Sequence, residues 1–198
     1  MTSSADDPAA CEVAHGHVPP DGDGRELVAV FFSPVARFLL QYGQDAGFRP
    51  LLIEPDPGRA DEARAAGFGV LGVVPGTLDL TADVVVTDHH RPELGPVLQQ
   101  ALASGARWIG VMGNPRHPAP HIPALAGLGV PDEEIARVHR PIGLNIGSRN
   151  PAEIAIATLA GLIADRNGRP GGFAFPVPGA DSDRSGVAPG ALAPSPAG

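Results

Sequence analysis

Lysine is absent from this chain, so all 14 of its basic residues are arginines. This absence excludes a P-loop with its phosphate-binding lysine, and it excludes catalysis through a lysine Schiff base. The formal net charge is −8. Nucleic acids and acidic membranes attract basic surfaces, so this charge argues against nonspecific binding to either. We therefore expect no nucleic acid and no membrane among the partners.

Cysteine is almost absent as well, since Cys11 is the only one. The chain cannot form an internal disulfide or a cysteine-based zinc or iron–sulfur site, and we predict no metal site. No apolar run approaches the ~20 residues of a membrane span. The N-terminus shows no signal-peptide pattern. We expect a soluble, cytoplasmic protein, and its core must consist of Ala, Val, Leu and Ile because aromatic residues make up only 5 %.

Glycine and proline are abundant, with 26 and 23 residues, and they gather at the two ends of the chain. Residues 1–24 are polar and show no hydrophobic period, which predicts a disordered arm. Residues 169–198 are rich in Gly and Pro, which predicts a flexible tail. The intervening residues 25–168 are enough for a single domain.

Strand and helix patterns alternate through this domain. Strands are expected at 27–32, 51–53, 70–74, 83–87, 107–112 and 142–146. Helices are expected after the capping residues Ser33, Asp56 and Asn150, each followed by a proline, and at 92–104, 120–128 and 132–138. This alternation predicts an α/β fold with a Rossmann-like, doubly wound and mostly parallel sheet. Ligands of such sheets bind at the carboxyl ends of the strands, so the loops after the strands are the candidate site.

Two sequence phrases in the C-terminal half resemble one family. They are WIGVMGNPRH at 108–117, and RPIGLNIG at 140–147 followed by NPAEIA at 150–155. On these phrases the chain resembles the XdhC/CoxI family, and the similarity extends over residues 26–168. The family consists of accessory factors for molybdenum hydroxylases.

The resemblance implies a Rossmann-like fold and a function in cofactor handling. A member of this family would bind the molybdenum cofactor (molybdopterin) as cargo, assist its sulfuration or protection, and deliver it to an apo molybdenum hydroxylase. That hydroxylase would be of the xanthine dehydrogenase or carbon monoxide dehydrogenase type. The resemblance further implies a homodimer, a cysteine desulfurase as a second partner, and an accessory rather than an enzymatic function.

The chain departs from the family pattern at three points. Only a short arm precedes the Rossmann-like domain, where family members carry a separate N-terminal domain. The first loop is Phe31-Phe32-Ser33-Pro34 instead of a glycine-rich loop, which argues against normal NAD(P) binding because a pyrophosphate needs close backbone approach and free amides. Asn145 stands where the family usually has Asp, which removes a carboxylate.

The candidate cofactor-binding residues all follow expected strands. Arg116 offers a planar fork for a phosphate, and the 139–150 loop leads into a helix N-terminus. Asp56, or its neighbour Glu54, stands where a ribose-binding acid would follow the first loop. The predicted set is Gly113, Asn114, Arg116, His139, Arg140, Gly143, Asn145, Gly147, Ser148, Asp56 and His89; no catalytic residue can be assigned.

Three alternatives remain at this stage. The first is an NAD(P)-binding oxidoreductase-like domain, and the second is a degenerate adaptor without a ligand. The third is a metal-dependent phosphoesterase, because Asp88-His89-His90 follows a strand as in DHH-type enzymes. The further acidic motifs that such an enzyme needs do not follow the upstream strands, so this third alternative is the weakest.

Overall fold

The computed structural model describes residues 24–113, 116 and 118–171. It contains one six-stranded sheet in the order β3-β2-β1-β4-β5-β6, in which every neighbouring pair is parallel. The predicted Rossmann-like α/β fold is confirmed. Nearly all of the predicted arm and most of the predicted tail lie outside the described residues. The strands are β1 (Glu26–Val30), β2 (Arg49–Ile53), β3 (Val70–Leu71), β4 (Asp83–Val86), β5 (Trp108–Val111) and β6 (Val138–His139).

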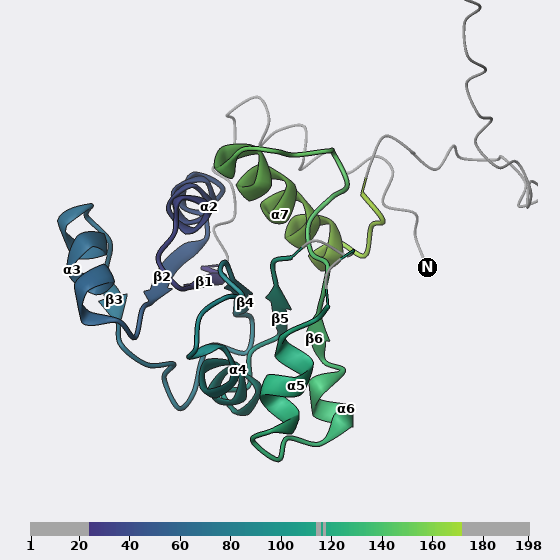
Figure 1. Ribbon diagram of the computed structural model, residues 1–198. Helices are drawn as coiled ribbons and strands as arrows, with labels where there is room; N and C mark the ends of the chain where they lie inside the picture. Colours follow the sequence, from purple (N-terminus) through teal and green to yellow (C-terminus); the bar gives the residue numbers. More distant parts are fainter. Residues whose placement is uncertain (1–23, 114–115, 117, 172–198) are drawn as a thin grey trace, which may run out of the picture.

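Helices cover both faces of the sheet, as Figure 1 shows: α2 and α7 lie over one face, and α4 and α5 lie over the other. No helix in the described part of the chain has the length and apolarity to span a membrane. The helices are α2 (Pro34–Asp45), α3 (Pro57–Ala65), α4 (Leu94–Ala103), α5 (His121–Ala126), α6 (Asp132–Ile135) and α7 (Pro151–Arg166).

Strand residues alternate between two hydrophobic clusters because successive side chains point to opposite faces of a sheet. Val28 and Val30 of β1 belong to the cluster under α4 and α5. Leu27 and Ala29 belong to the cluster under α2 and α7. All four side chains are fully buried. Because both faces of the central strands are buried, the sequences of these strands are unbroken apolar runs.

The three predicted helix caps are present. Ser33 accepts a hydrogen bond from the amide of Ala36, Asp56 from that of Arg59, and Asn150 from that of Glu153. A proline occupies the first turn of each helix, where no backbone donor is needed. These local signals fix the starts of α2, α3 and α7 at the carboxyl ends of the strands.

The predicted sixth strand at 142–146 is wrong, because the sixth strand is β6 at Val138–His139. Gly143 has φ +86°, which interrupts an extended backbone. The amide of Leu144 donates to the carbonyl of Ala157 in α7 instead of to a neighbouring strand. The segment therefore leaves the sheet and crosses α7, and the side chain of Ile146 stays exposed.

A network of ion pairs lies at the amino-terminal ends of the strands. The carboxylate of Asp83 is fully buried at the start of β4. Arg107 and the last residue of α7, Arg166, both donate to it at 2.7–2.9 Å. Arg107 also pairs with Asp165 at 2.7 Å. Buried charges need such partners, and the network fixes the end of α7 on the sheet.

Candidate functional site

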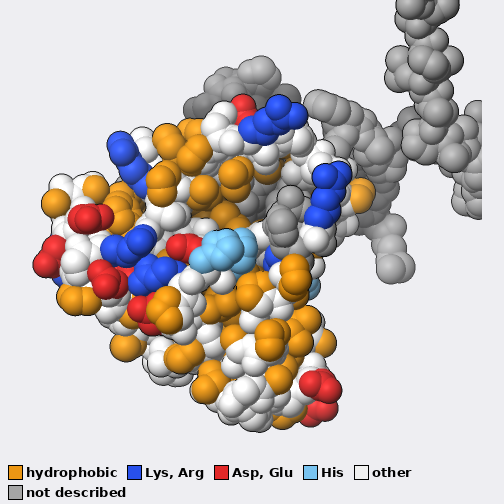
Figure 2. Space-filling view, viewed as in Figure 1, with side chains coloured by type: hydrophobic (Ala, Val, Ile, Leu, Met, Phe, Trp, Pro, Cys, Tyr) orange, Lys and Arg blue, Asp and Glu red, His pale blue; other side chains and the backbone are white. Residues whose placement is uncertain are grey.

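A cavity of about 890 Å³ lies at the carboxyl ends of β4 and β5, between the start of α2 and the side of α7. Its polar lining comes from four segments. Thr87 and His89 follow β4, Arg116 follows β5, Asn145, Ser148 and Arg149 precede α7, and Thr158 lies within α7. Figure 2 shows histidine side chains near the centre of one face of the molecule, with arginine side chains on both sides. We call the cavity of about 890 Å³ the large cavity.

The same cavity has an apolar part. Val35 contributes from α2, Met112 from the end of β5, Ile142 and Leu144 from the segment before α7, and Ile154 from α7 itself. Ligand sites in proteins are mostly apolar with a few polar groups that fix orientation, and volumes of roughly 300–1,000 Å³ are typical. The large cavity has both properties.

Residues 141–149 form one wall of the large cavity, and we call this segment the strap. Gly143 touches α7 so closely that an added Cβ would lie 3.1 Å from the amide nitrogen of Thr158. On the helix side, an added Cβ at Gly161 would lie 3.1 Å from the Cα of Gly143. Two glycines therefore let the strap cross α7 backbone to backbone, and a hydrogen bond of 3.0 Å from Leu144 to Ala157 holds it there.

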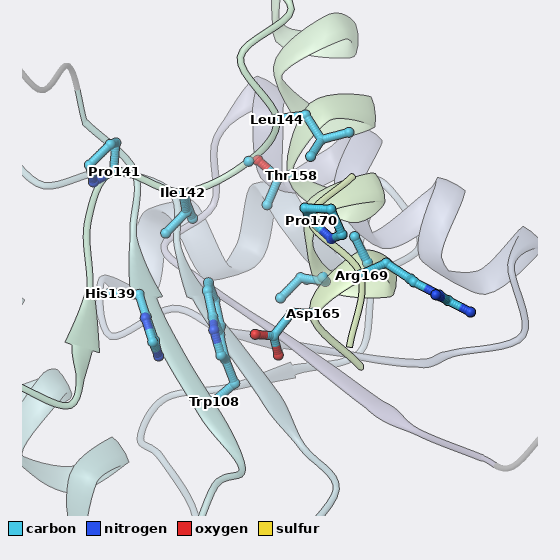
Figure 3. Close-up of a pocket in the computed structure, with 13 residues that line it drawn as sticks. Trp108, His139, Pro141, Ile142, Leu144, Thr158, Asp165, Arg169 and Pro170 are labelled. Carbon is cyan, nitrogen blue, oxygen red and sulfur yellow. The ribbon is translucent and has the colours of Figure 1, made fainter. Parts of the chain in front are cut away.

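A smaller pocket of about 260 Å³ lies against the strap as well, towards the C-terminal half of α7. It shares strap residues Ile142, Gly143 and Leu144 with the large cavity. In Figure 3 the side chains of Trp108 and His139 lie side by side along one wall. Their rings stack, with centroids 5.0 Å apart and planes 6° apart. The strap thus contributes to both pockets, so its position affects both.

The loop after β5 lies against the side chain of Arg140. An added Cβ at Gly113 would lie 2.5–2.9 Å from guanidinium atoms of Arg140, so a larger residue here would displace the end of the Arg140 side chain. This guanidinium is also close enough to lower the pKa values of two histidines. For His121, burial lowers the pKa most, and the charge of Arg140 lowers it further. For His89, burial again lowers the pKa most, followed by the charges of His90 and Arg140. Both rings are therefore neutral near pH 7.

The sheet order reverses between β1 and β4, where a dinucleotide would bind in a Rossmann fold. The hydroxyls of Ser33 and Thr87 lie 2.9 Å apart across this point. Thr87 donates to the carbonyl of Phe31 at 2.8 Å, while Ser33 accepts from the amide of Ala36. These side chains join the two strands where a pyrophosphate would otherwise approach the backbone.

Glu54 is also engaged internally. Its side chain is buried, and it accepts hydrogen bonds of 2.8 Å from the amides of Phe32 and Asp56. Arg91 donates to both of its oxygens, at 2.9 and 3.2 Å, and lies 4.7 Å from the ring centroid of Phe31. The carboxylate of Glu54 therefore neutralises Arg91 and holds the first loop through the amide of Phe32. Because these contacts engage both of its oxygens, we assign Glu54 no role in binding a ribose.

Comparison with known proteins agrees with this fold. Residues 27–162 match the family model described as the XdhC Rossmann domain. The chain belongs to the XdhC family. It is 34 % identical over 100 residues to the uncharacterized protein YqeB of Escherichia coli (strain K12), a match that covers 48 % of this chain and 18 % of YqeB.

A solved structure shares the fold of this XdhC-family chain. It is a Bacillus halodurans protein described as a xanthine dehydrogenase, with a TM-score of 0.56 and 21 % sequence identity. The match covers 73 % of this chain and 45 % of that one. The XdhC-family chain thus spans less than half the length of each of these two proteins.

The structure brings seven of the predicted site residues of this XdhC-family chain to the large cavity. Of the others, His139 lines the smaller pocket, Arg140 lies against Gly113, and Asp56 caps α3 outside both pockets. Asn114 lies outside the described residues. The seven at the large cavity are His89, Gly113, Arg116, Gly143, Asn145, Gly147 and Ser148.

The predicted set of site residues omits three polar residues of the large cavity, Thr87, Arg149 and Thr158. Thr87 ends the apolar run that predicts β4, so its pattern indicates only a strand. Arg149 belongs to the candidate loop at 139–150, and its place directly before the cap Asn150 is the available signal. Thr158 lies inside the helical pattern of α7, which gives no sign of a site. Among the described residues, which include Asp88, His89 and His90, no group of three His, Cys, Asp or Glu is placed so that it could hold a metal ion.

The buried His121 predicts a pH dependence of stability. Its side chain is 4 % exposed, and no described residue forms a hydrogen bond with its Nδ1. Its pKa is lowered from an unfolded value of about 6.5. The unfolded chain therefore binds more protons, so the stabilisation is present above about pH 6.5 and is lost as the pH falls through the folded pKa. We expect the melting temperature to fall between about pH 7.5 and 5.5, and to fall less in a His121→Leu variant.

Thermal unfolding across this pH range measures the effect. His139→Gln is the matched control, because His139 is an exposed histidine at the smaller pocket. The melting temperature of His139→Gln should fall between about pH 7.5 and 5.5 as much as that of the unaltered protein. An equal decline in His121→Leu and the unaltered protein would contradict the prediction.

Proposed function

We propose that this chain is an accessory factor that binds the molybdenum cofactor in the large cavity and assists its sulfuration and insertion into a molybdenum hydroxylase. The hydroxylase would be of the xanthine dehydrogenase or carbon monoxide dehydrogenase type. Family membership supports this proposal. The description of the Bacillus halodurans neighbour as a xanthine dehydrogenase points in the same direction.

The observation that carries the proposal is the place and lining of the large cavity. The cavity lies at the carboxyl ends of β4 and β5, and it combines an apolar part with arginine, amide and hydroxyl groups. The molybdenum cofactor has a flat pterin with many hydrogen-bonding groups and a phosphate. Apolar side chains such as Met112 and Ile142 suit the ring, and Arg116 suits the phosphate.

The same geometry argues against an oxidoreductase that uses a dinucleotide. Ser33, Thr87 and Glu54 already bind the backbone and side-chain groups at the first loop. NAD(P) would have to displace the Glu54–Arg91 pair to reach these groups. In our proposal the cofactor is cargo and the chain is not itself an enzyme.

Sulfuration needs a donor that carries sulfur, usually as a persulfide on a cysteine. The chain has a single cysteine, Cys11. Following the family resemblance, we propose a cysteine desulfurase as the sulfur donor and the apo hydroxylase as the recipient. Both would meet a homodimer of this chain in the cytoplasm.

Cofactor binding by the purified full chain tests the proposal. Equilibrium filtration with pterin fluorescence should show saturable binding of the molybdenum cofactor. Arg116→Ala should weaken that binding about tenfold, because it removes a charge-assisted contact. Arg64→Ala is the control, since Arg64 lies on α3 and pairs with Asp61 outside the cavity. NAD and ATP serve as competing nucleotides.

The outcomes separate the alternatives. A folded protein that binds no pterin would overturn the cofactor proposal. Co-purification with a hydroxylase subunit in that case would favour an adaptor without a ligand. Saturable binding of NAD with protection against heat would favour the oxidoreductase-like alternative.

A further inference from the structure

Among the described residues, none that lines the large cavity is acidic, although the chain is acidic. The sequence has 22 Asp and Glu residues and a net charge of −8. The described lining includes two arginines and neither Asp nor Glu. A protein of this composition would place carboxylates around a cavity of this size if charge were distributed evenly. The local charge therefore indicates an anionic ligand.

The two arginines approach the cavity from separate segments. Arg116 belongs to the loop after β5, and Arg149 stands at the end of the strap, one residue before the cap of α7. The backbone amide of Arg149 donates to the Glu153 carboxylate at 3.0 Å, which fixes the base of the side chain. Among the ion pairs found in the described part of the chain, none involves the Arg149 guanidinium.

Other arginines in the fold are used to neutralise carboxylates. Arg91 pairs with Glu54, and Arg107 and Arg166 pair with Asp83. These pairs hold the structure together and leave little positive charge for a ligand. Arg149 is exposed beside an acid-free cavity. Its position therefore suits binding of an external anion.

Hydrogen-bonding groups accompany the arginines. The hydroxyl-bearing Ser148 and Thr87 and the amide-bearing Asn145 line the same cavity. A guanidinium presents a planar fork of donors that matches the oxygens of a phosphate, and a second guanidinium suits its second negative charge. The lining thus combines the groups that proteins use to bind phosphate esters.

We infer that Arg149, together with Arg116, binds the phosphate group of a phosphate ester in the large cavity. The inference rests on the proposed function in placing a phosphate-bearing ligand there, and it adds Arg149 as a second residue that binds the phosphate. The ring of the ester would lie on the apolar side, over Met112, Ile142 and Ile154.

Binding of simple anions tests this inference on the full chain. Inorganic phosphate and pyrophosphate are the probes, and isothermal titration calorimetry at low salt gives their affinities. Arg149→Gln and Arg116→Gln should each weaken pyrophosphate binding about tenfold, as expected for loss of a charge-assisted contact. Arg169→Gln is the matched control, because Arg169 lines the smaller pocket and does not line the large cavity. It should change the affinity by less than about twofold.

Competition with the pterin cofactor distinguishes this inference from the proposed function. If pyrophosphate binds through Arg149 but the pterin does not bind, the phosphate inference stands and the cofactor proposal falls. If the pterin binds equally well to Arg149→Gln and pyrophosphate does not compete with it, the inference is overturned and the cofactor proposal stands. A pyrophosphate affinity that Arg149→Gln and Arg169→Gln lower equally would also overturn the inference, since it would reflect net charge alone.

Discussion

Arg91→Ala is expected to destabilise the protein by about 3–5 kcal/mol, the usual cost of breaking a buried ion pair. Arg91 makes two hydrogen bonds to Glu54, and the exposed fractions of the two side chains are 9 % and 0 %. Removal of Arg91 would leave the carboxylate of Glu54 buried without its counter-charge. It would also remove the guanidinium from the face of Phe31.

Chemical denaturation of the full chain measures this effect. The control is Arg64→Ala, because Arg64 and Asp61 form an exposed pair whose side chains are 53 % and 79 % accessible. Exposed pairs contribute roughly 0–1 kcal/mol, so the control should unfold nearly as the unaltered protein does. The double variant Glu54→Gln/Arg91→Ala should recover part of the loss, since it buries no charge. A midpoint for Arg91→Ala equal to that of the control would show that the Glu54–Arg91 pair does not hold the first loop.

Gly143→Ala is expected to have the second large effect, because it acts on both the backbone and the site. Gly143 has φ +86°, and a non-glycine residue there costs roughly 1–2 kcal/mol. The added Cβ would also lie 3.1–3.3 Å from backbone atoms of Ala157 and Thr158, which the helix holds in place. Overpacking of this kind costs about 1–3 kcal/mol more. The strap would move off α7, and the large cavity would change shape.

Gly147→Ala provides a matched control within the strap. Gly147 also has a positive φ, +69°, but an added Cβ there would meet no atom within 4 Å. This variant should show only the backbone cost of roughly 1–2 kcal/mol. We expect Gly143→Ala to weaken pterin and pyrophosphate binding more than tenfold, and Gly147→Ala to weaken it much less. Equal losses in the two variants would mean that contact with α7 does not position the strap.

The sequence predicts well those features that depend on neighbouring residues. Ser33-Pro34, Asp56-Pro57 and Asn150-Pro151 each place a cap before a helix, and each cap forms as predicted. β1 and β4 are buried on both faces, so their sequences are unbroken apolar runs. Such a run predicts a buried strand even when the neighbouring strands and helices are unknown. The parallel direction of the strands then follows from the alternation of strands and helices.

Features that depend on distant residues are harder to predict. Glu54 and Arg91 are 37 residues apart, and neither alone indicates that they pair. The apolar pattern of 142–146 suits a strand, but its hydrogen bond goes to α7 because Gly143 and Gly161 allow the strap to cross the helix closely. The pattern of one segment cannot show which surface that segment will meet.

The packing of α7 against α2 has a consequence for folding. The two helices cover one face of the sheet, but α2 follows the first strand and α7 is the last helix of the described chain. Asp83 and Arg166 are likewise separated by 83 residues. Contacts between such distant parts of the sequence form slowly, because a long loop must close first. During synthesis the apolar side of α2 that packs against α7 would remain exposed until α7 emerges, so a chain that stops before Pro151 should aggregate rather than fold.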